Sequence, residues 1–287
     1  MMMNTAKLKQ PLKYRIMRGV VLLILLIVLL ITIYPVVWMV LTSFKTKREI
    51  TMNSMFSLPA SLNVTGYIEA WTSGKMSIFL VNSAKISVSS LILILFVCIP
   101  SSFAMSKMIW KFKNVAVAYI TLGVMIPVQV CLLPFFQMYK GIGLLNSHTG
   151  LILVLLSANI TVTNLLFISF FHGLPNDIME AAVVDGCSIY SMLFRIIMPL
   201  MRNVILTVLT VAFLNCWNEL IYSQTLLSST NLKTVQTGLL MFDDAHGSKN
   251  WSAVFAAMTI SVLPTLIIYA VLSKYMIQGL TAGSVKG

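Results

Sequence analysis

A short polar segment in the middle of the chain combines acidic side chains with very small ones. Asp177, Glu180 and Asp185 surround Ala181 and Ala182. Small side chains let another backbone come close, and carboxylates supply polar anchors, so the pattern favours a surface that docks another protein. The alternative is an amphipathic hairpin lying on lipid headgroups, but such helices are usually rich in Lys and Arg. We interpret the segment as a protein-docking surface.

Local signals predict that this docking segment, residues 172–202, is a pair of helices. Pro175 suits the first turn of a helix, where no N–H is needed. Gly186 can take the left-handed conformation that ends a helix, and Ser188 is a suitable N-cap for the next one. Pro199 ends the second helix. One apolar face, which would fasten the second helix to the rest of the protein, is formed by Ile189, Met192, Leu193, Ile196 and Ile197.

Patterns for catalysis or metal binding are missing from the sequence. The three histidines lack the spacing of metal ligands, and the four cysteines indicate neither a disulfide framework nor a metal site. The only Gly-Lys pair, Gly74-Lys75, lacks the earlier glycine and the following hydroxyl residue of a phosphate-binding loop. We therefore expect no catalytic residue, no metal and no cofactor bound by this chain.

The composition requires a membrane. Hydrophobic residues make up 58% of the chain and charged residues 10%, and the mean hydropathy is +0.91. Soluble domains have about 25% charged residues. Each apolar run reaches the roughly 20 residues of a spanning helix, twice the length of a barrel strand. The sequence predicts an all-α polytopic membrane protein with six transmembrane helices, near residues 18–44, 78–106, 114–137, 150–171, 203–224 and 251–273.

The distribution of Lys and Arg predicts the orientation. Cytoplasmic loops are enriched in these residues, and most of them fall on the cytoplasmic side when both termini are placed there. This gives a cytoplasmic segment 1–17, a transmembrane domain 18–273 and a cytoplasmic tail 274–287. The first span is too long for a signal peptide and lacks a cleavage site, so we expect a retained anchor. The formal net charge of +12 then reflects topology, and we expect no nucleic-acid partner.

Polar side chains inside the predicted spans are candidates for lining a solute pathway or an outer vestibule. They could equally serve as hydrogen-bonding groups between helices. Lys85 and Glu219 lie at similar predicted depth, so we expect them to pair or to face one aqueous vestibule. The alternative is that Lys85 extends to the membrane surface. The full set of candidates is Ser157, Thr161, Asn164, Asn215, Trp217, Asn218, Glu219 and Lys85.

The docking segment and several spans resemble one known family. Glu180-Ala181-Ala182, then Asp185-Gly186 and Pro199, is similar to the EAA loop of binding-protein-dependent ABC importer permeases. Residues 279–287 and parts of the spans are similar to its carbohydrate branch, the maltose permease G subunit type. Those parts are Asn82-Ser83, Pro127-Val128-Gln129, Pro134, Trp217-Asn218-Glu219 and Pro264. Two positions depart from the pattern, because Cys187 replaces the usual alanine and Asn203 stands near a common second proline.

The resemblance implies a type I ABC importer permease fold in the cell membrane. Its partners would be a second, different permease subunit, an extracytoplasmic solute-binding protein that delivers a sugar, and two ATPase subunits that hold ATP and Mg²⁺. In some members of the branch the C-terminal tail reaches between the ATPase subunits. ATPase coupling would fall to Glu180, Ala181, Ala182, Asp185, Gly186 and Pro199.

A different class of function stays open from the residues alone. A self-sufficient secondary transporter or channel would be expected to carry carboxylates near the membrane midplane and inverted repeats within its own chain. The only carboxylate inside a predicted span is Glu219, away from the middle, and we find no convincing internal repeat. The sequence therefore favours an energy-coupled permease subunit.

Overall fold

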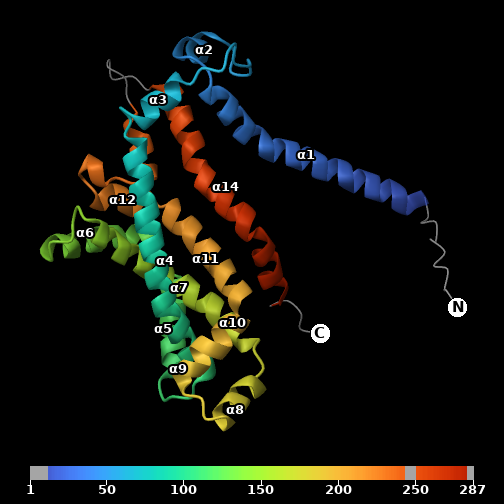
Figure 1. The fold of residues 1–287 in the computed structure, drawn as a ribbon, viewed down its shortest axis with the longest axis vertical. Coiled ribbons are helices and arrows are strands. Elements are labelled where there is room, and N and C mark those ends of the chain that lie inside the picture. Colours follow the sequence, from blue (N-terminus) through green and yellow to red (C-terminus); the bar gives the residue numbers. More distant parts are fainter. Residues whose placement is uncertain (1–11, 243–249, 283–287) are drawn as a thin grey trace.

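The computed structural model describes residues 12–242 and 250–282, which form an elongated helical bundle (Figure 1). No strand occurs within these two ranges, so the predicted all-helical class is confirmed. The docking segment lies at one end of the bundle, and the short helices α2 and α3 lie at the other. The long helices are α1 (Leu12–Ser43), α4 (Met76–Lys107), α7 (His148–His172), α11 (Arg202–Trp217) and α14 (Trp251–Ala282).

Close packing of α4 along α7, and of α11 along α14, forms the centre of the bundle. Small hydroxyl residues make such packing feasible in a membrane, because they let helix backbones approach each other. On α4, Ser87, Ser90 and Ser102 are all buried. Asn164 of α7 is fully buried and accepts a 2.7 Å hydrogen bond from Ser101 of α4. These polar contacts fix how the two helices are aligned.

The apolar length of α1 is almost unpartnered in this chain. Its side chains from Tyr14 to Val37 are exposed, burial begins only at Trp38, and the helix runs away from the bundle (Figure 1). Contact with the bundle is made where Trp38 packs edge-on against Phe255 of α14, with ring centroids 5.3 Å apart. A helix that is apolar on all sides suits contact with lipid or with another membrane subunit.

Four described helices, α1, α4, α7 and α14, are long and apolar enough to cross a membrane. A fifth is counted if residues 189–200 and α11, which are bent by 81° relative to each other, are taken as one span. The predicted continuous helix over 114–137 is wrong. It is divided into α5 (Lys113–Gly123), a 3-10 turn (Val128–Cys131) and α6 (Leu132–Gly141).

The physical cause of this break is the sequence between α5 and α6. Pro127 lacks the N–H that a continuing helix would need, and Gly123 is a weak helix former. The 11 residues of α5 extend about 16 Å, roughly half of the hydrocarbon thickness. The predicted fifth span, 203–224, is also shorter as a helix, since α11 stops at Trp217 and α12 (Ile221–Leu226) follows a break. The count of six spans stays a prediction.

The end of the bundle opposite the docking segment is tied together by α4. Asn82 donates 2.9 Å hydrogen bonds to the carbonyls of Asn231 and Lys233, and Ser83 accepts one from the Val235 N–H. A Cβ on Gly238 would meet the Phe79 ring at 2.1 Å, so only glycine fits there. The elements at this end are α2 (Lys47–Met52), α3 (Thr65–Trp71), η3 (Thr230–Leu232), α13 (Val235–Gly238) and η4 (Leu239–Met241).

Some expectations lie outside the described residues. They concern residues 1–11 of the predicted cytoplasmic N-terminal segment and residues 283–287 of the predicted cytoplasmic tail.

Candidate functional site: a docking helix and a polar cavity

The docking segment begins with α8 (Asp177–Val184), close to the predicted start. Asp177 and Glu180 lie in its first turn, where negative charge is favourable beside the helix dipole. Its N-cap residue, Asn176, makes no side-chain cap, because its own backbone is helical (φ −69°, ψ −28°), and its Oδ1 accepts a hydrogen bond from Lys107. The start of α8 is therefore fixed by a side chain of α4.

The end of α8 has the predicted glycine turn. Gly186 has φ +75°, its N–H donates to the Val183 carbonyl at 3.0 Å, and the Cys187 N–H donates to the Ala182 carbonyl at 2.9 Å. This pair of bonds is the Schellman motif, which satisfies carbonyls that the helix leaves open. Ser188 then accepts from the Ser191 N–H at 3.2 Å, so the predicted N-cap is confirmed.

The two alanines of α8 do not face the same way. Glu180 and Ala181 are exposed, but Ala182 is only 3% exposed and packs into the main apolar core. The expectation that both alanines form the outer surface is wrong for Ala182, because residues one apart on a helix point in different directions. The outward apolar area comes from Val183 and Val184, which are 63% and 85% exposed.

The second helix of the docking segment lies partly in the core. Met192, Leu193 and Ile197 are buried and Ile196 is half-buried against the core, but Ile189 is 50% exposed and lies outside the buried face. The helical segment consists of α9 (Ile189–Ser191), a π-helix (Met192–Ile197) and α10 (Met198–Leu200).

The sequence predicts that Pro199 ends this helix, and this is wrong, because Pro199 lies inside α10. The chain turns by 81° between Leu200 and Arg202. A proline cannot donate to the preceding turn and its ring crowds the carbonyl there, which favours a widened π segment just before it. The proline therefore shapes the helix one turn before the bend.

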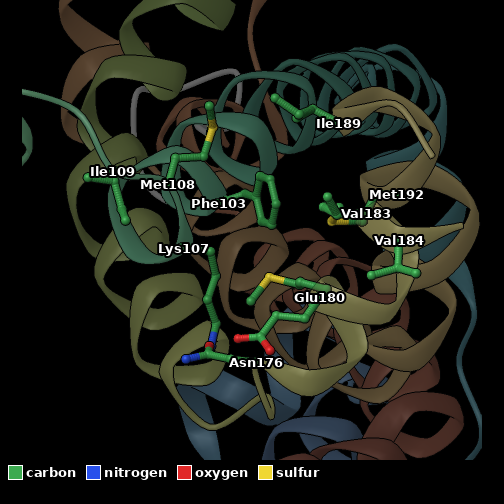
Figure 2. A pocket seen from close by; sticks show the side chains of 11 residues that line it. Phe103, Lys107, Met108, Ile109, Asn176, Glu180, Val183, Val184, Ile189 and Met192 are labelled. Carbon is green, nitrogen blue, oxygen red and sulfur yellow. The ribbon is translucent and has the colours of Figure 1, made fainter. Parts of the chain in front are cut away.

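A cavity of about 560 Å³ separates α8 from the end of α4 (Figure 2). Lys107 and Asn176 approach each other on one side of it, and Glu180 lies nearby. The rest of the lining is mainly apolar, from Phe103, Met108, Ile109, Met179, Val183, Val184, Ile189 and Met192. On this side α8 is joined to α4 through Asn176, and an open groove lies beside its exposed residues.

A second cavity, of about 460 Å³, lies between α7 and the break that separates α11 from α12. Asn215, Asn218 and Glu219 line it, as the sequence suggested for this group, together with Asn159 and Tyr222. The Asn215 amide donates to Asn159 Oδ1 at 3.1 Å. Amides and a carboxylate around a cavity of this size are suited to hydrogen-bonding a polar solute.

Glu219 is held by the first turn of α12. Its carboxylate accepts hydrogen bonds from the Tyr222 N–H at 2.7 Å, from the Ser223 N–H at 2.9 Å and from Ser223 Oγ at 2.8 Å. Among the described residues, no ion pair joins Glu219 to Lys85, which is exposed on α4 and does not line this cavity. The predicted pairing is wrong, because the α12 N-terminus already supplies the partners of the carboxylate.

The other predicted pathway residues are not at this cavity. Asn164 joins α7 to α4, and Ser157 is exposed and donates to its own helix at 2.8 Å. Thr161 lies against Gly123 of α5. Trp217 is buried, stacks on Phe213 and donates to the Ser261 carbonyl of α14 at 3.2 Å, so it packs helices together.

Three residues of the two sites were not predicted from the sequence. Asn159 is a lone amide in an apolar run, and only its position on the α7 face beside Asn215 reveals it. Lys107 carries no signal in the sequence beyond its positive charge, although it contacts a loop nearly seventy positions later in the chain. Val184 could have been found from the sequence, because an apolar residue beside the terminating Asp185-Gly186 turn has little room to be buried.

Together, the fold and the two sites define a helical membrane subunit of a transport system, with a docking helix at one end and a polar cavity between its helices. Residues 97–281 match the family described as "Binding-protein-dependent transport system inner membrane component". The chain belongs to this family, and the resemblance seen in its motifs is confirmed.

Related proteins agree with this assignment. The chain is 31% identical to a probable ABC transporter permease protein, YurM of Bacillus subtilis, over 88% of this chain and 84% of the relative. It is 28% identical to the sulfoquinovosyl glycerol transport system permease protein SmoH of Agrobacterium fabrum, over 89% of each chain. It is 29% identical to the arabinooligosaccharides transport system permease protein AraQ of Halalkalibacterium halodurans, over 90% of this chain and 92% of the relative.

A solved structure shares the fold. A chain of a bacterial ABC transporter involved in the import of the acidic polysaccharide alginate aligns with a TM-score of 0.83 and 20% identity. The alignment covers 94% of this chain and 99% of that chain. The type I ABC importer permease fold predicted for this chain is therefore present.

Proposed function

We propose that this chain is the permease subunit of an ATP-driven importer for a carbohydrate. The observation that carries the proposal is family membership over residues 97–281, together with relatives named as permeases for sugars and oligosaccharides. The cavity between α7 and α12 supports a hydroxyl-rich solute, since it offers amide and carboxylate groups beside the apolar surfaces of Leu155, Leu214 and Tyr222. The chain itself binds no cofactor and catalyses no reaction.

The docking surface for an ATPase subunit is the outer face of α8. This face combines exposed Glu180, Ala181 and Asp185 with the apolar side chains of Val183 and Val184. An apolar centre with a charged edge is typical of protein interfaces. ATP and Mg²⁺ would be held by two ATPase subunits, and their closure would move α8 and, through it, the bundle.

A second permease subunit, different from this one, would cover α1. The exposed apolar length of α1 projects from the bundle, so a neighbouring membrane subunit can pack along it (Figure 1). The opposite end of the bundle, with α2, α3 and α13, would meet an extracytoplasmic solute-binding protein. In this proposal α8 and both termini would lie on the cytoplasmic side of the cell membrane, and the chain would cross it six times, with α5 and α6 together forming one crossing.

Asn215, Asn218 and Glu219, with Asn159, would contact the sugar as it passes. The amide of Asn159 donates to the Leu155 carbonyl at 2.8 Å and its Oδ1 accepts from Asn215, so this residue orients Asn215 toward the cavity. Asn218 accepts from Gln236 at 3.3 Å and is exposed, which leaves its amide N–H groups to donate to a hydroxyl.

Reconstitution tests the proposal. The chain is assembled with its second permease, ATPase and binding protein in proteoliposomes, and uptake of radiolabelled maltotriose, arabinotriose and sulfoquinovosyl glycerol is measured. We expect ATP-dependent uptake of at least one of these sugars. Uptake that continues without the ATPase subunits contradicts the proposal. So does an importer that takes up a non-carbohydrate solute in an ATP-dependent manner but takes up none of the sugars.

A further inference from the structure

Lys107 is the last residue of α4, and its ammonium group reaches across to the entrance of α8 (Figure 2). Nζ donates to the Leu174 carbonyl at 2.7 Å and to Asn176 Oδ1 at 2.8 Å. Hydrogen bonds from a charged donor are stronger than neutral ones. Two such bonds from one ammonium hold both the loop before α8 and its N-cap residue against α4.

The Asn176 side chain, at the start of α8, accepts its hydrogen bond from Lys107 of α4. An asparagine at an N-cap usually accepts from the helix N–H groups, but here its side chain makes no such bond. The Asn176 carbonyl still closes the first turn of α8 by accepting from the Met179 and Glu180 N–H groups, while the Asn176 side chain attaches that turn to α4.

Along its length α8 packs against the core through Ala182 and the half-buried Met179. The cavity of about 560 Å³ lies between α8 and the end of α4, and within α8 only Ala182 is buried. The Schellman turn at Gly186 holds the far end. On the side that faces the end of α4, the open groove offers α8 few opposing contacts, so the two Lys107 hydrogen bonds hold the start of α8 there.

The other end of α4 is fixed to the loop at the opposite end of the bundle. Asn82 and Ser83 bind the backbone of residues 231–235. The 25 residues between Asn82 and Lys107 extend about 37 Å as a helix. One helix thus has polar contacts to the outer loop at one end and to the docking helix at the other.

We propose that Lys107 is a positioning residue that couples α4 to the docking helix α8, so that movement of the bundle and closure of the ATPase stay linked. This proposal rests on the proposed function, in which α8 contacts the ATPase. Lys107 touches neither ATP nor sugar. Its contribution is to keep α8 at one orientation relative to α4 while force passes between them.

The test compares Lys107→Met with Lys107→Arg in the complete importer. For each, ATP hydrolysis and uptake are measured in proteoliposomes with the sugar from the panel that the wild-type importer transports. We expect Lys107→Met to keep ATPase association and ATP hydrolysis but to lower sugar moved per ATP by about tenfold. We expect Lys107→Arg to keep most of the wild-type ratio, because a guanidinium can still donate to both oxygens.

Lys113 provides the matched control. Its ammonium also binds the end of α4, donating to the Ser106 carbonyl at 2.8 Å, but among the residues that the structure describes it makes no hydrogen bond to α8. Lys113→Met removes the same charge near the same site, and we expect its sugar-to-ATP ratio to stay near wild type. An unchanged ratio in Lys107→Met, or an equal loss in Lys113→Met, overturns the proposal.

A second variant covers the case in which Lys107→Met does not assemble. Asn176→Ala removes one of the two acceptors and is expected to lower the ratio less, whereas Asn176→Asp keeps an acceptor and should preserve it. Equal ratios in these two variants contradict the proposal. If wild-type uptake does not depend on ATP, the proposed function fails instead, so the two failures can be told apart.

Discussion

Replacing Gly186 by alanine is expected to weaken ATPase binding through the backbone alone. Gly186 has φ +75°, a left-handed conformation that costs an L-residue about 1–2 kcal/mol. A Cβ built at this position meets nothing within 4 Å, so no steric clash adds to this cost. The whole effect should therefore come from opening the turn that closes α8.

An energy of this size changes the population of the closed turn substantially. About 1–2 kcal/mol corresponds to a factor of roughly 5–30 in an equilibrium. If docking requires the closed turn, the affinity of the ATPase subunit for the membrane complex falls in proportion to the fraction of molecules in which the turn is closed. About 5–30-fold is therefore the largest loss expected, reached when the open turn predominates in the variant. Gly186→Asn should lose less, because asparagine tolerates the left-handed region better than alanine.

The assay is a titration of purified ATPase subunit onto the membrane complex in detergent, together with the melting temperature of that complex. Gly143→Ala is the matched control, since Gly143 has φ +71° and also meets nothing within 4 Å, but lies in the turn after α6. It should carry the same backbone cost without loss of ATPase affinity. Equal affinities for Gly186→Ala and Gly143→Ala would refute the link between this turn and docking.

Three further outcomes are expected from other parts of the chain. Gly238→Ala should lower the melting temperature more than Gly186→Ala, because its Cβ would overlap the Phe79 ring, and an equal or smaller shift would contradict this. Asn215→Ala should raise the sugar concentration needed for half-maximal uptake while leaving ATPase association unchanged; unchanged uptake kinetics would remove the residue from the sugar pathway. Hydrogen bonds from Thr46 and Ala60 backbone N–H groups lower the pKa of Glu49, so stability of this loop is present above the usual pKa of a glutamate and lost as pH falls through the lowered value. The hydrogen-exchange protection factors of these two amides, which are corrected for the intrinsic exchange rate, should therefore fall as the pH is lowered. Glu49→Gln should abolish this pH dependence, and an unaltered pH dependence in the variant would contradict the assignment.

Local chemistry made part of the docking segment predictable. The glycine turn at Gly186 and the N-cap at Ser188 depend on residues within a few positions of each other, and both occur where the sequence indicates. The direction in which Ala182 points depends instead on where the core lies, which the two adjacent alanines do not encode. For the same reason Ile189 belongs to the apolar stripe by spacing but stays half-exposed in the fold.

Longer-range features could not be derived from the sequence. Apolar length suggested a continuous helix over 114–137, but hydropathy does not register the missing N–H of Pro127 that helps to break it. The Lys85–Glu219 pairing was inferred from depth alone, and the short helix α12 that binds the carboxylate does not follow from a hydropathy pattern. Lys107 and Asn159 have their roles only because helices distant in sequence bring partners to them.

The most direct measurement is site-specific cross-linking from the outer face of α8. Val184, which is 85% exposed, is replaced by cysteine after the native Cys187 is changed to serine, and the assembled importer is treated with a short thiol-to-amine cross-linker. Val81→Cys, on a 66% exposed position of α4 toward the opposite end, is the control. We expect a cross-link to the ATPase subunit from Val184→Cys and none from Val81→Cys. The contradicting result is an importer that assembles and transports but in which Val184→Cys cross-links only to a permease subunit and not to the ATPase subunit. In that case α8 would not be the helix that contacts the ATPase.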